Sequence, residues 1–533
     1  MNQRSRIDWL LLAGFCGFLF FFGLAYFGLI GADEPRYAQI AREMLERHDW
    51  ITPVLGGKAW LEKPPLYYWQ AMLAYRVFGV SDWAARLPSA IDTTLMVVAI
   101  YIFLRRVRPS VSVDGALVTA SAAGIIGFAR AASTDMPLAA MLTIAMLGWY
   151  AWSESGSKAY LISFYAFLAL AVLAKGPVAI VLAALIIFLF AVLRKETLLL
   201  WRTLWIPGLL IFCAVTLPWY VAVQVRNPQF LRIFILEHNL ARFGTNLYRH
   251  KEPFWYFLPV TLLGLVPWAV FAIAGLAEAW RNWWSERSKT LSSPEPLALF
   301  LAIWLLVPVI FFSISQSKLP GYILPAIPAG TLLMTDYIRQ RLMEKSRIGL
   351  PLTTLHSLVA AAPIVPALMI QYAVLQHRLA WGRALAISSI FALFIATGIA
   401  VTIRLQPGAL RFVTLIPVVL GVAAVLRLGS PALDSTLSAR PVATEISRME
   451  SRRLPLSVFR VPRELEYGLA FYRNQVIGRY EAGEIPGTEH LLVAPEGTQA
   501  DIAKEVPGRR VSYLGSFAAQ GLDYYWVAAS SGH

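Results

Sequence analysis

The sequence predicts a polytopic α-helical membrane protein with a small α/β domain at its C-terminal end. Hydrophobic residues make up 57% of the 533 positions and charged residues only 15%, which is too little charge to cover a water-soluble surface of this size. The apolar residues form continuous blocks of roughly 20, the length that crosses the hydrocarbon core as a helix. From about residue 430 the composition becomes that of a soluble chain.

About thirteen apolar segments are expected to span the membrane, with ends defined to within several residues. They cover residues 8–30, 86–104, 114–131, 137–152, 159–174, 177–193, 203–222, 254–277, 297–314, 322–338, 351–373, 384–403 and 411–428. The first segment follows Arg4 and Arg6 without a clear small-residue cleavage site. We therefore expect a retained span rather than a removed signal peptide.

Basic residues predict the orientation of these spans. Many lie in the connections on the N-terminal side of the membrane, among them Arg105, Arg106, Arg108, Lys158, Arg194, Lys195, Arg281, Arg339, Arg341, Arg404 and Arg411. The short connections on the other side hold only Lys175, Lys318, Arg378 and Arg383. Since cytoplasmic loops carry an excess of Lys and Arg, the N-terminus is expected in the cytoplasm and the C-terminal domain outside.

The net charge of +15 is expected to come from the same excess of basic residues in the cytoplasmic loops. In a chain with many spans, excess Lys and Arg fit cytoplasmic loops and contacts with anionic lipid heads, so membrane lipids rather than nucleic acid are the expected partners. Cys16 and Cys213 lie inside apolar runs and say nothing about disulfides.

Residues 1–429 are expected to form the membrane domain, with two long outer loops at 33–85 and 223–253. In the first loop, apolar residues between Tyr37 and Leu45 recur at helical spacing. A second amphipathic pattern follows Pro64 and Pro65, which suit a helix start. Such helices would lie along the membrane surface.

Residues 430–533 are expected to form the α/β domain outside the membrane. Four segments have the pattern of strands: Pro455–Val461, His490–Val493, Val511–Gly515 and Tyr524–Ala528. Residues Arg463–Tyr472 have the pattern of a helix.

Ionisable and polar residues gather on the predicted outer face. The clusters are Asp33-Glu34 with Arg36, Glu62-Lys63, Ser133-Thr134-Asp135, Lys175, Glu237-His238 with Arg242, His250-Lys251-Glu252, and Lys318 with Tyr322. Taken singly, a carboxylate such as Asp33 fits a water boundary, Lys175 fits a lipid-head anchor, and each histidine fits a hydrogen-bonded loop residue. Together on one face they indicate a functional site, because ionisable groups near membrane depth are costly.

These residue types suit transfer from a membrane-bound phosphate ester. Carboxylates activate a nucleophile or support a cationic transition state. Lys and Arg neutralise a departing phosphate. A Glu–His pair could hold a divalent metal ion. The sequence contains neither a P-loop nor a nucleotide-binding glycine fingerprint, which disfavours an ATP-driven pump and a conventional nucleotide-sugar enzyme.

Five motifs resemble those of the bacterial lipid A aminoarabinose transferases, which belong to the GT-C integral-membrane glycosyltransferases together with protein O-mannosyltransferases. They are Asp33-Glu34-Pro35-Arg36-Tyr37, Glu62-Lys63-Pro64-Pro65-Leu66-Tyr67-Tyr68-Trp69, Ser133-Thr134-Asp135, Ala174-Lys175-Gly176-Pro177 and Lys318-Leu319-Pro320-Gly321-Tyr322. The motif match covers roughly residues 30–325, while the later spans and the C-terminal domain agree in layout. In this order the motifs are quite specific for the superfamily.

The resemblance implies a sugar donor on undecaprenyl phosphate and transfer in the periplasm of a bacterium, at its inner membrane. In the aminoarabinose branch the sugar is 4-amino-4-deoxy-L-arabinose and the acceptor is a lipid A phosphate. This modification lowers the negative charge of the outer membrane and gives resistance to polymyxin-type cationic peptides.

The resemblance also implies roles for individual residues. Asp33 and Asp135 are the expected catalytic acids. Lys63 matches the lysine that meets the carrier phosphate, and the expected donor-phosphate group is Lys63, Arg36, Arg242, Lys318 and Tyr322. Glu62 matches a metal-contacting glutamate, and either His238 or His250 is its expected histidine partner for a divalent ion.

Other functions remain open from the residues alone. A related enzyme would transfer another polyprenol-linked sugar to a different glycan or to protein hydroxyls. A lipid-linked sugar flippase would also have many spans and a charged cavity. However, alternating access calls for polar groups throughout the membrane depth and often for repeated halves, and this sequence shows one polar face and no repeat. A non-catalytic scaffold working through its soluble domain is the remaining alternative.

Overall fold

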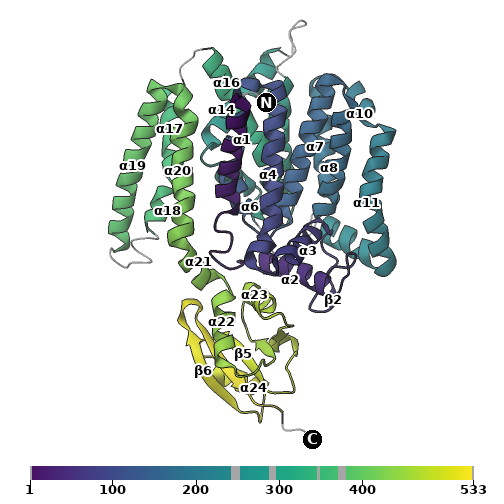
Figure 1. Ribbon diagram of the computed structural model, residues 1–533, viewed down its shortest axis with the longest axis vertical. Coiled ribbons are helices and arrows are strands. Elements are labelled where there is room, and N and C mark those ends of the chain that lie inside the picture. Colours follow the sequence, from purple (N-terminus) through teal and green to yellow (C-terminus); the bar gives the residue numbers. More distant parts are fainter. Residues whose placement is uncertain (1–2, 242–251, 287–295, 345–347, 370–379, 531–533) are drawn as a thin grey trace.

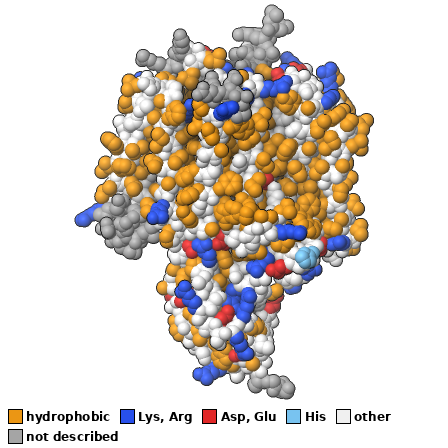
Figure 2. All heavy atoms as spheres, in the orientation of Figure 1, with side chains coloured by type: hydrophobic (Ala, Val, Ile, Leu, Met, Phe, Trp, Pro, Cys, Tyr) orange, Lys and Arg blue, Asp and Glu red, His pale blue; other side chains and the backbone are white. Residues whose placement is uncertain are grey.

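The computed structural model describes residues 3–241, 252–286, 296–344, 348–369 and 380–530. It shows a large helical bundle with a small lobe at one end, and the two chain termini lie at opposite ends of the molecule (Figure 1). Hydrophobic side chains cover the flank of the bundle, whereas charged side chains gather at its two ends and on the lobe (Figure 2). This distribution is that of a membrane-spanning protein, which confirms the predicted fold class.

The bundle contains helix in each of the thirteen expected segments. Its elements are α1 (Gln3–Cys16), η1 (Gly17–Phe21), α4 (Asp82–Val107), η2 (Pro109–Val111), α5 (Ser112–Ala120), α6 (Ala123–Ala129), α7 (Asp135–Ser155), α8 (Lys158–Lys175), α9 (Val178–Leu193), α10 (Leu198–Thr203), α11 (Ile206–Arg226), η3 (Arg232–Ala241), α13 (Phe257–Gly264), α14 (Ala269–Glu286), α15 (Pro296–Ile314), η4 (Pro320–Ala326), α16 (Ile327–Met343), α17 (Leu350–Ala361), α18 (Ile364–Met369), α19 (Trp381–Leu405), η6 (Pro407–Ala409), α20 (Leu410–Ala424) and η7 (Val425–Gly429).

Eight helices within the described ranges are long and apolar enough to cross a membrane, or up to ten if each of two bent pairs forms one span. The bent pairs are α5 with α6 and α13 with α14. The expected count of thirteen therefore stays a prediction. The first helical stretch is shorter than expected, because it ends at Phe21 and Gly23 then takes a left-handed φ of +67°.

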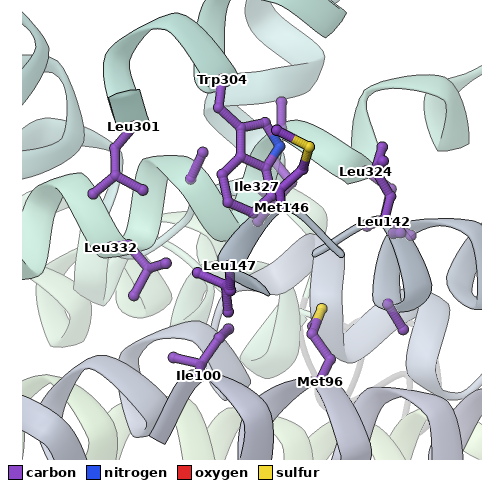
Figure 3. Packing of buried hydrophobic residues seen from close by; sticks show 14 of the residues in the cluster. Met96, Ile100, Leu142, Met146, Leu147, Leu301, Trp304, Leu324, Ile327 and Leu332 are labelled. Atoms are coloured by element: carbon purple, nitrogen blue, oxygen red, sulfur yellow. The ribbon is translucent and has the colours of Figure 1, made fainter. Parts of the chain in front are cut away.

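Helix α7 lies at the centre of the bundle. Within its apolar window 94% of the residues are buried, whereas the corresponding value for α11 is 22%. Figure 3 shows the core around it, where Met146 and Leu147 of α7 meet Ile100 of α4, Trp304 of α15 and Leu332 of α16. The start of α7 is thereby held in a fixed position within the bundle, which matters because Asp135 is its first residue.

The first long loop folds into two helices, as expected, at the end of the bundle that faces the lobe (Figure 1). Helix α2 (Asp33–Glu46) and helix α3 (Leu66–Phe78) pack on each other, and the hairpin β1 (Val54–Leu55)–β2 (Lys58–Ala59) lies between them in sequence. The carboxylate of Glu43 in α2 accepts hydrogen bonds from the backbone N–H groups of Gly56 (2.9 Å) and Gly57 (3.1 Å) in the hairpin turn. Both glycines have positive φ, so the turn that leads into Glu62 and Lys63 is fixed against α2.

The lobe contains the four expected strands and the expected helix. Its five-stranded sheet has the order β4-β3-β5-β7-β6, with β3 parallel to β4 and β5 and the other pairs antiparallel. Its elements are β3 (Leu456–Val458), α23 (Arg463–Arg473), β4 (Gly478–Arg479), η8 (Tyr480–Ala482), β5 (His490–Pro495), α24 (Gln499–Glu505), β6 (Val511–Phe517), η9 (Ala518–Gln520) and β7 (Leu522–Val527).

The bundle continues into the lobe without a loop at residue 430. Helix α21 (Ser430–Leu437) follows η7 directly, and α22 (Arg440–Met449) comes next. The division at residue 430 therefore stays a prediction about domains, whereas the described helix passes through that position.

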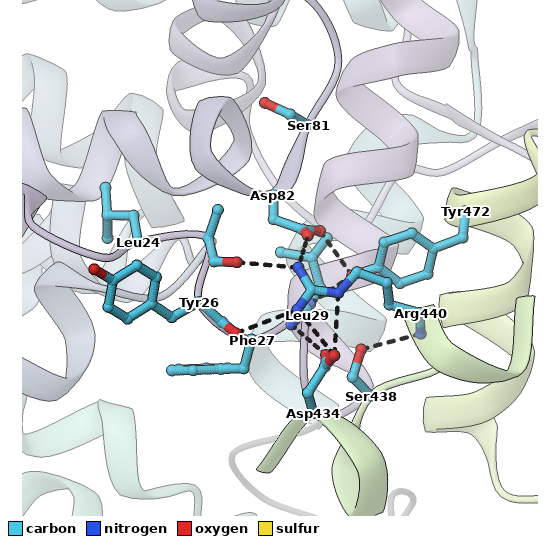
Figure 4. Close-up of polar contacts among 12 residues, drawn as sticks. Leu24, Tyr26, Phe27, Leu29, Ser81, Asp82, Asp434, Ser438, Arg440 and Tyr472 are labelled. Atoms are coloured by element: carbon cyan, nitrogen blue, oxygen red, sulfur yellow. Dashed lines mark hydrogen bonds and ion pairs between the residues drawn. The ribbon is translucent and has the colours of Figure 1, made fainter. Parts of the chain in front are cut away.

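Arg440 connects the lobe to the bundle, as Figure 4 shows. Its guanidinium pairs with Asp82 at the start of α4 (2.9 Å) and with Asp434 of α21 (2.9 Å), and it donates to the carbonyl of Ala25 (3.0 Å). The hydroxyl of Tyr472 in α23 also donates to Asp82 (2.7 Å). This network fixes the lobe directly beneath α2 and α3.

Candidate functional site

Asp33 and Arg36 lie on the first turn of α2. Acidic side chains are favoured there because the helix dipole is positive at its N-terminus. The Arg36 guanidinium donates to the Asp33 carboxylate and to the hydroxyl of Tyr37 (3.3 Å). It also lies near the rings of Tyr37 (5.0 Å) and Trp60 (5.3 Å). The Asp33 side chain is 49% exposed and Arg36 only 15%, so this pair presents its carboxylate outward.

The environment of Arg36 keeps it charged. Burial alone would lower the pKa of its guanidinium, but Tyr37, Asp33 and Glu62 raise that pKa above its usual range. Arg36 is therefore a partly buried cation that is paired with Asp33 and lies within the electrostatic reach of Glu62.

Asp135 forms a second carboxylate–cation pair. Its carboxylate is paired with the ammonium of Lys175, the last residue of α8, and it accepts a hydrogen bond from Ser133 Oγ (3.1 Å). A Cβ at Gly321 would lie 2.7–2.9 Å from this carboxyl group, so only glycine permits the approach of η4. The Lys175 ammonium also lies 4.6 Å from the centre of the Tyr322 ring. The start of α7, the end of α8 and η4 thus meet at Asp135.

Tyr37 connects the two carboxylates. Its side chain is almost fully buried, and burial is the largest cause that raises the pKa of its phenol. The charges of Asp33 and Asp135 raise it further. Both carboxylates therefore lie within electrostatic reach of the same buried phenol.

Glu62 and Lys63 reach the same site from the loop before α3. The Glu62 charge acts on Arg36 and on the buried phenol of Tyr68, and the Lys63 charge acts on the Asp135 carboxylate. The loop therefore places one further cation beside Asp135, where the sequence predicted a phosphate-binding lysine.

His238 is the histidine that the structure places beside Glu62. Its Nε2 lies 3.8 Å from Glu62 Oε1. His250 and Arg242 lie outside the described residues. No group of three or more His, Cys, Asp or Glu side chains with metal-binding spacing occurs in the described ranges. The pair therefore fits a divalent ion only if phosphate oxygens or water complete its coordination.

Lys318 is buried close to the end of α15. Its ammonium donates to the backbone carbonyl of Ser315 (2.5 Å). This contact satisfies one of the carbonyls that a helix leaves open at its C-terminal end. The following residues, Gly321 and Tyr322, are the ones that contact Asp135 and Lys175, so the Lys318 segment contributes to the site mainly through η4.

Several buried polar atoms around the two aspartates have no hydrogen-bond partner within the described ranges. They are Arg36 Nε, Trp60 Nε1, Tyr68 Oη and Thr134 Oγ1. Buried polar groups are rarely left unpaired in native proteins. A hydroxyl-rich or phosphate-containing ligand would supply the missing donors and acceptors, so the cluster is suited to a polar substrate.

The neighbouring Glu34 has a structural role that its sequence context does not reveal. It forms a buried ion pair with Arg86 of α4 (2.7 Å) and accepts a hydrogen bond from the backbone N–H of Ala132 (2.7 Å). Arg86 also donates to the carbonyls of Leu24 (2.7 Å) and Gly28 (2.8 Å). This network holds the first turn of α2 against the turn before Asp135 and so sets the distance between the two halves of the site.

Lys175 was counted among the polar clusters of the outer face without a role of its own, and Arg86 was not singled out. Lys175 stands in one of the motifs quoted above, but its partner is 40 residues earlier in the chain. Arg86 is 52 residues from Glu34 and stands at the start of the expected span 86–104. An unpaired charge at the edge of a span was the available signal for both.

Comparison with known proteins places the chain among membrane glycosyltransferase relatives. The profile of the family described as "Dolichyl-phosphate-mannose-protein mannosyltransferase" matches residues 9–234. A protein of Pseudomonas paraeruginosa named "Undecaprenyl phosphate-alpha-4-amino-4-deoxy-L-arabinose arabinosyl transferase" is 32% identical over 360 residues, covering 66% of this chain and 62% of that protein. A Yersinia pestis protein of the same name is 33% identical over 315 residues, covering 57% and 54%.

A solved structure shares the fold over nearly the whole chain. The structure of ArnT from Cupriavidus metallidurans bound to undecaprenyl phosphate superposes with a TM-score of 0.78 at 23% identity, covering 98% of both chains. The chain spans 62% and 54% of the lengths of the curated relatives above. The resemblance indicated by the motifs is thus confirmed, and the chain is a homologue of these proteins over the matched parts.

Proposed function

We propose that this chain is a polyprenyl-phosphate-dependent glycosyltransferase that moves 4-amino-4-deoxy-L-arabinose from undecaprenyl phosphate to a phosphate of lipid A. The observation that supports it most is the meeting of Asp33, Asp135, Arg36, Lys63 and Lys175 at one end of the bundle. The names of the relatives include this sugar and this carrier. Lipid A is the acceptor that the family resemblance implies.

The proposed location is the bacterial inner membrane, with the N-terminus in the cytoplasm and both the site and the C-terminal lobe in the periplasm. The bias of Lys and Arg toward the loops at the N-terminal end supports this orientation. The site lies at the opposite end, next to the lobe (Figure 1). A carrier lipid in the bilayer could reach it there without leaving the membrane.

The proposed reaction is a displacement at the anomeric carbon of the sugar. An acceptor phosphate oxygen forms a bond to that carbon, and the bond between the carbon and the carrier phosphate oxygen breaks. The electron pair of the broken bond leaves with undecaprenyl phosphate. Because the acceptor phosphate is already ionised, the step releases no proton, and stabilising the negative charge on the leaving phosphate is the main task.

The residues are suited to that task by charge. Lys63 and Arg36 would neutralise the carrier phosphate, with Arg242, Lys318 and Tyr322 as further proposed contributors on the basis of family position. Asp33 is the accessible carboxylate and would contact the acceptor or the amino group of the sugar. Asp135, held by Lys175, would support positive charge that develops on the sugar ring.

A divalent ion is a further part of the proposal. Glu62 and His238 would hold it, with the carrier phosphate and water as the other ligands. Such an ion supplies charge stabilisation at a phosphoryl oxygen. We expect that Glu62→Gln lowers the metal content of the purified protein and that chelation lowers transfer. Equal metal content in wild type and Glu62→Gln would contradict this site.

A protein or glycan hydroxyl is the alternative acceptor. The match to a protein mannosyltransferase profile favours it. A hydroxyl must lose a proton during transfer, and the half-exposed Asp33 would then act as the general base.

The test is mass spectrometry of lipid A from a strain that makes the donor but lacks this gene, with and without the gene restored. Restoration should add an aminopentose to a lipid A phosphate, together with polymyxin resistance. Asp33→Asn should abolish the addition. Glu46→Gln is the matched control, because Glu46 is on the same helix, is also 49% exposed and also pairs with an arginine.

Two results would change the proposal. Unmodified lipid A in cells shown to contain the donor would overturn the lipid A acceptor and direct the search to glycans and exported proteins. Normal transfer by both Asp33→Asn and Asp135→Asn would overturn the site assignment.

A further inference from the structure

A cavity lined in part by Glu34 lies within the helical bundle. Its volume is about 580 Å³, within the range of about 300–1,000 Å³ typical of small-molecule sites. It lies between α6 and the loop after η1 on one side and α17, α18, α20 and η7 on the other. Neither Asp33 nor Asp135 lines it. It is therefore separate from the candidate active site.

Most of the cavity wall is apolar. Side chains such as Phe27, Ile126, Ile364, Val418 and Leu426 face it. A wall of this kind favours hydrocarbon over water. The apolar part of the wall by itself would suit an uncharged hydrocarbon ligand.

Three charged side chains from the described part of the chain also line the cavity: Glu34, Arg86 and Arg130. Glu34 and Arg86 neutralise each other in the buried ion pair described above. Arg130 is left over, so the wall carries one excess positive charge.

Arg130 is only partly satisfied within the chain. It is nine-tenths buried, and its Nη1 donates to the carbonyl of Leu19 (3.0 Å). Its Nη2 is buried and has no hydrogen-bond partner among the residues that the structure describes. Among the described residues no carboxylate forms an ion pair with it.

A buried guanidinium without a counterion is costly, and more so beside a membrane. The cost falls if an anion occupies the cavity and accepts a hydrogen bond from Nη2. The adjoining apolar wall would then contact the hydrocarbon part of the same ligand. The cavity therefore offers an anion-binding group and an apolar wall side by side, which suits an anionic amphiphile.

We propose that this cavity binds a lipid whose phosphate contacts Arg130 and whose hydrocarbon chain lies between α6 and α20. Both a phospholipid of the bilayer and a polyprenyl phosphate have this chemistry. The proposal concerns binding at a site separate from Asp33 and Asp135 and holds whether or not the proposed transfer is correct.

The experiment is native mass spectrometry of the full-length protein in detergent with added lipids. The lipids are phosphatidylglycerol, diacylglycerol with the same acyl chains but no phosphate, and undecaprenyl phosphate. Arg130→Gln removes the charge. Gly127→Phe fills the cavity, since Gly127 lines it and a Cβ there meets no atom within 4 Å. Gly398→Phe is the matched control, because Gly398 is equally open but lies on α19, outside the cavity lining.

We expect one anionic lipid to bind at least about tenfold more tightly than diacylglycerol, the scale of a charge-assisted hydrogen bond. Arg130→Gln should remove that advantage, Gly127→Phe should weaken binding of both lipids, and Gly398→Phe should have no effect. Dependence on Arg130 for phosphatidylglycerol alone identifies a bilayer lipid, and dependence for undecaprenyl phosphate alone identifies the carrier. Equal binding of both anionic lipids to wild type, Arg130→Gln and Gly127→Phe would overturn the proposal.

Discussion

At the scale of single residues, the pair Asp135–Lys175 has two possible purposes. Asp135 begins α7 and Lys175 ends α8, so each charge is favourable for the dipole of its own helix. The pair therefore fits a structural link between neighbouring helices. It also places a fixed negative charge within electrostatic reach of Lys63 and a positive charge over the Tyr322 ring.

Neutralising the pair separates the two purposes. Lys175→Met should destabilise the protein, because it leaves a buried carboxylate without its cation. The double variant Lys175→Met/Asp135→Asn should recover much of the thermal stability while transfer stays at least about 100-fold below wild type, since the charge near the sugar is absent. Thermal unfolding and transfer per folded protein are the measurements. If the double variant recovers transfer together with stability, the pair is only a structural link.

At the scale of elements, Glu34 and Arg86 join three parts of the chain around the site. They connect the loop after η1, the first turn of α2 and the turn before α7, through contacts of 2.7–3.0 Å. No single one of these segments has enough regular structure to fix its own position. The ion pair therefore sets the geometry in which Asp33 and Asp135 face one site.

Removing Arg86 should lower the stability of the folded protein strongly. Arg86→Gln leaves Glu34 buried without its cation and is expected to cost about 3–5 kcal/mol. Arg42→Gln is the control, because it breaks a partly exposed pair with Glu46 at 3.0 Å and should change stability by about 1 kcal/mol or less. Thermal unfolding in detergent measures both. Similar melting temperatures for the two variants would contradict the role of the network.

The lobe has a pH-dependent element at the start of β5. His490 Nε2 is hydrogen-bonded to the Tyr480 hydroxyl (2.5 Å), and its Nδ1 is bonded to the carbonyl of Thr488 (2.9 Å). Burial, with a contribution from Arg509, lowers the pKa of His490 below its ordinary value. The folded lobe therefore keeps this ring neutral at pH values where the unfolded chain would protonate it.

The lobe is expected to lose stability as the pH falls below about 6.5, the ordinary pKa of histidine. In that range the unfolded chain binds more protons than the folded one, so acid favours unfolding, whereas above it His490 has no effect. His490→Gln should flatten the dependence. Hydrogen exchange of the β5 amides in the full chain, corrected for intrinsic rates, measures it. Protection that is equally pH-dependent in His490→Gln would assign the effect to other groups.

At the scale of the whole molecule, the lobe is connected to the bundle beside the candidate site. Arg440 and Tyr472 both contact Asp82 at the start of α4, and the ring of Tyr467 in α23 lies 5.7 Å from the Arg36 guanidinium. The lobe therefore contacts a residue of the site as well as the bundle. The lobe therefore forms one side of the surroundings of Arg36.

Breaking these contacts should increase local opening both in the lobe and in the loop before α2. Arg440→Ala is expected to increase hydrogen exchange in residues 24–30 and in α23, because it removes two ion pairs and the bonds to the carbonyls of Ala25 and Tyr26. Arg448→Ala on the same helix is the control, since that side chain is exposed. Unchanged exchange in Arg440→Ala would show that packing of the lobe does not depend on Arg440.

Much of this organisation was predictable because it depends on local patterns. Continuous apolar runs gave the helical bundle, and helical spacing in residues 37–45 gave α2. Alternation and turn residues gave four of the five strands of the lobe. Strand β4 is only two residues long, which is too short to show a sequence pattern. It forms because its backbone pairs with the edge of β3.

The sequence by itself determined that the chain is a membrane protein with Asp33, Asp135, Lys63 and Glu62 on one face, because composition and the ends of apolar runs depend only on nearby residues. Only the tertiary structure decided that Lys175 pairs with Asp135, that Arg86 holds Glu34, that His238 approaches Glu62, and that Arg130 lines a separate cavity. These pairings join residues 40 to 176 positions apart or depend on several helices at once. The packing of the bundle brings these residues together, and local sequence patterns do not show which charges will be in contact.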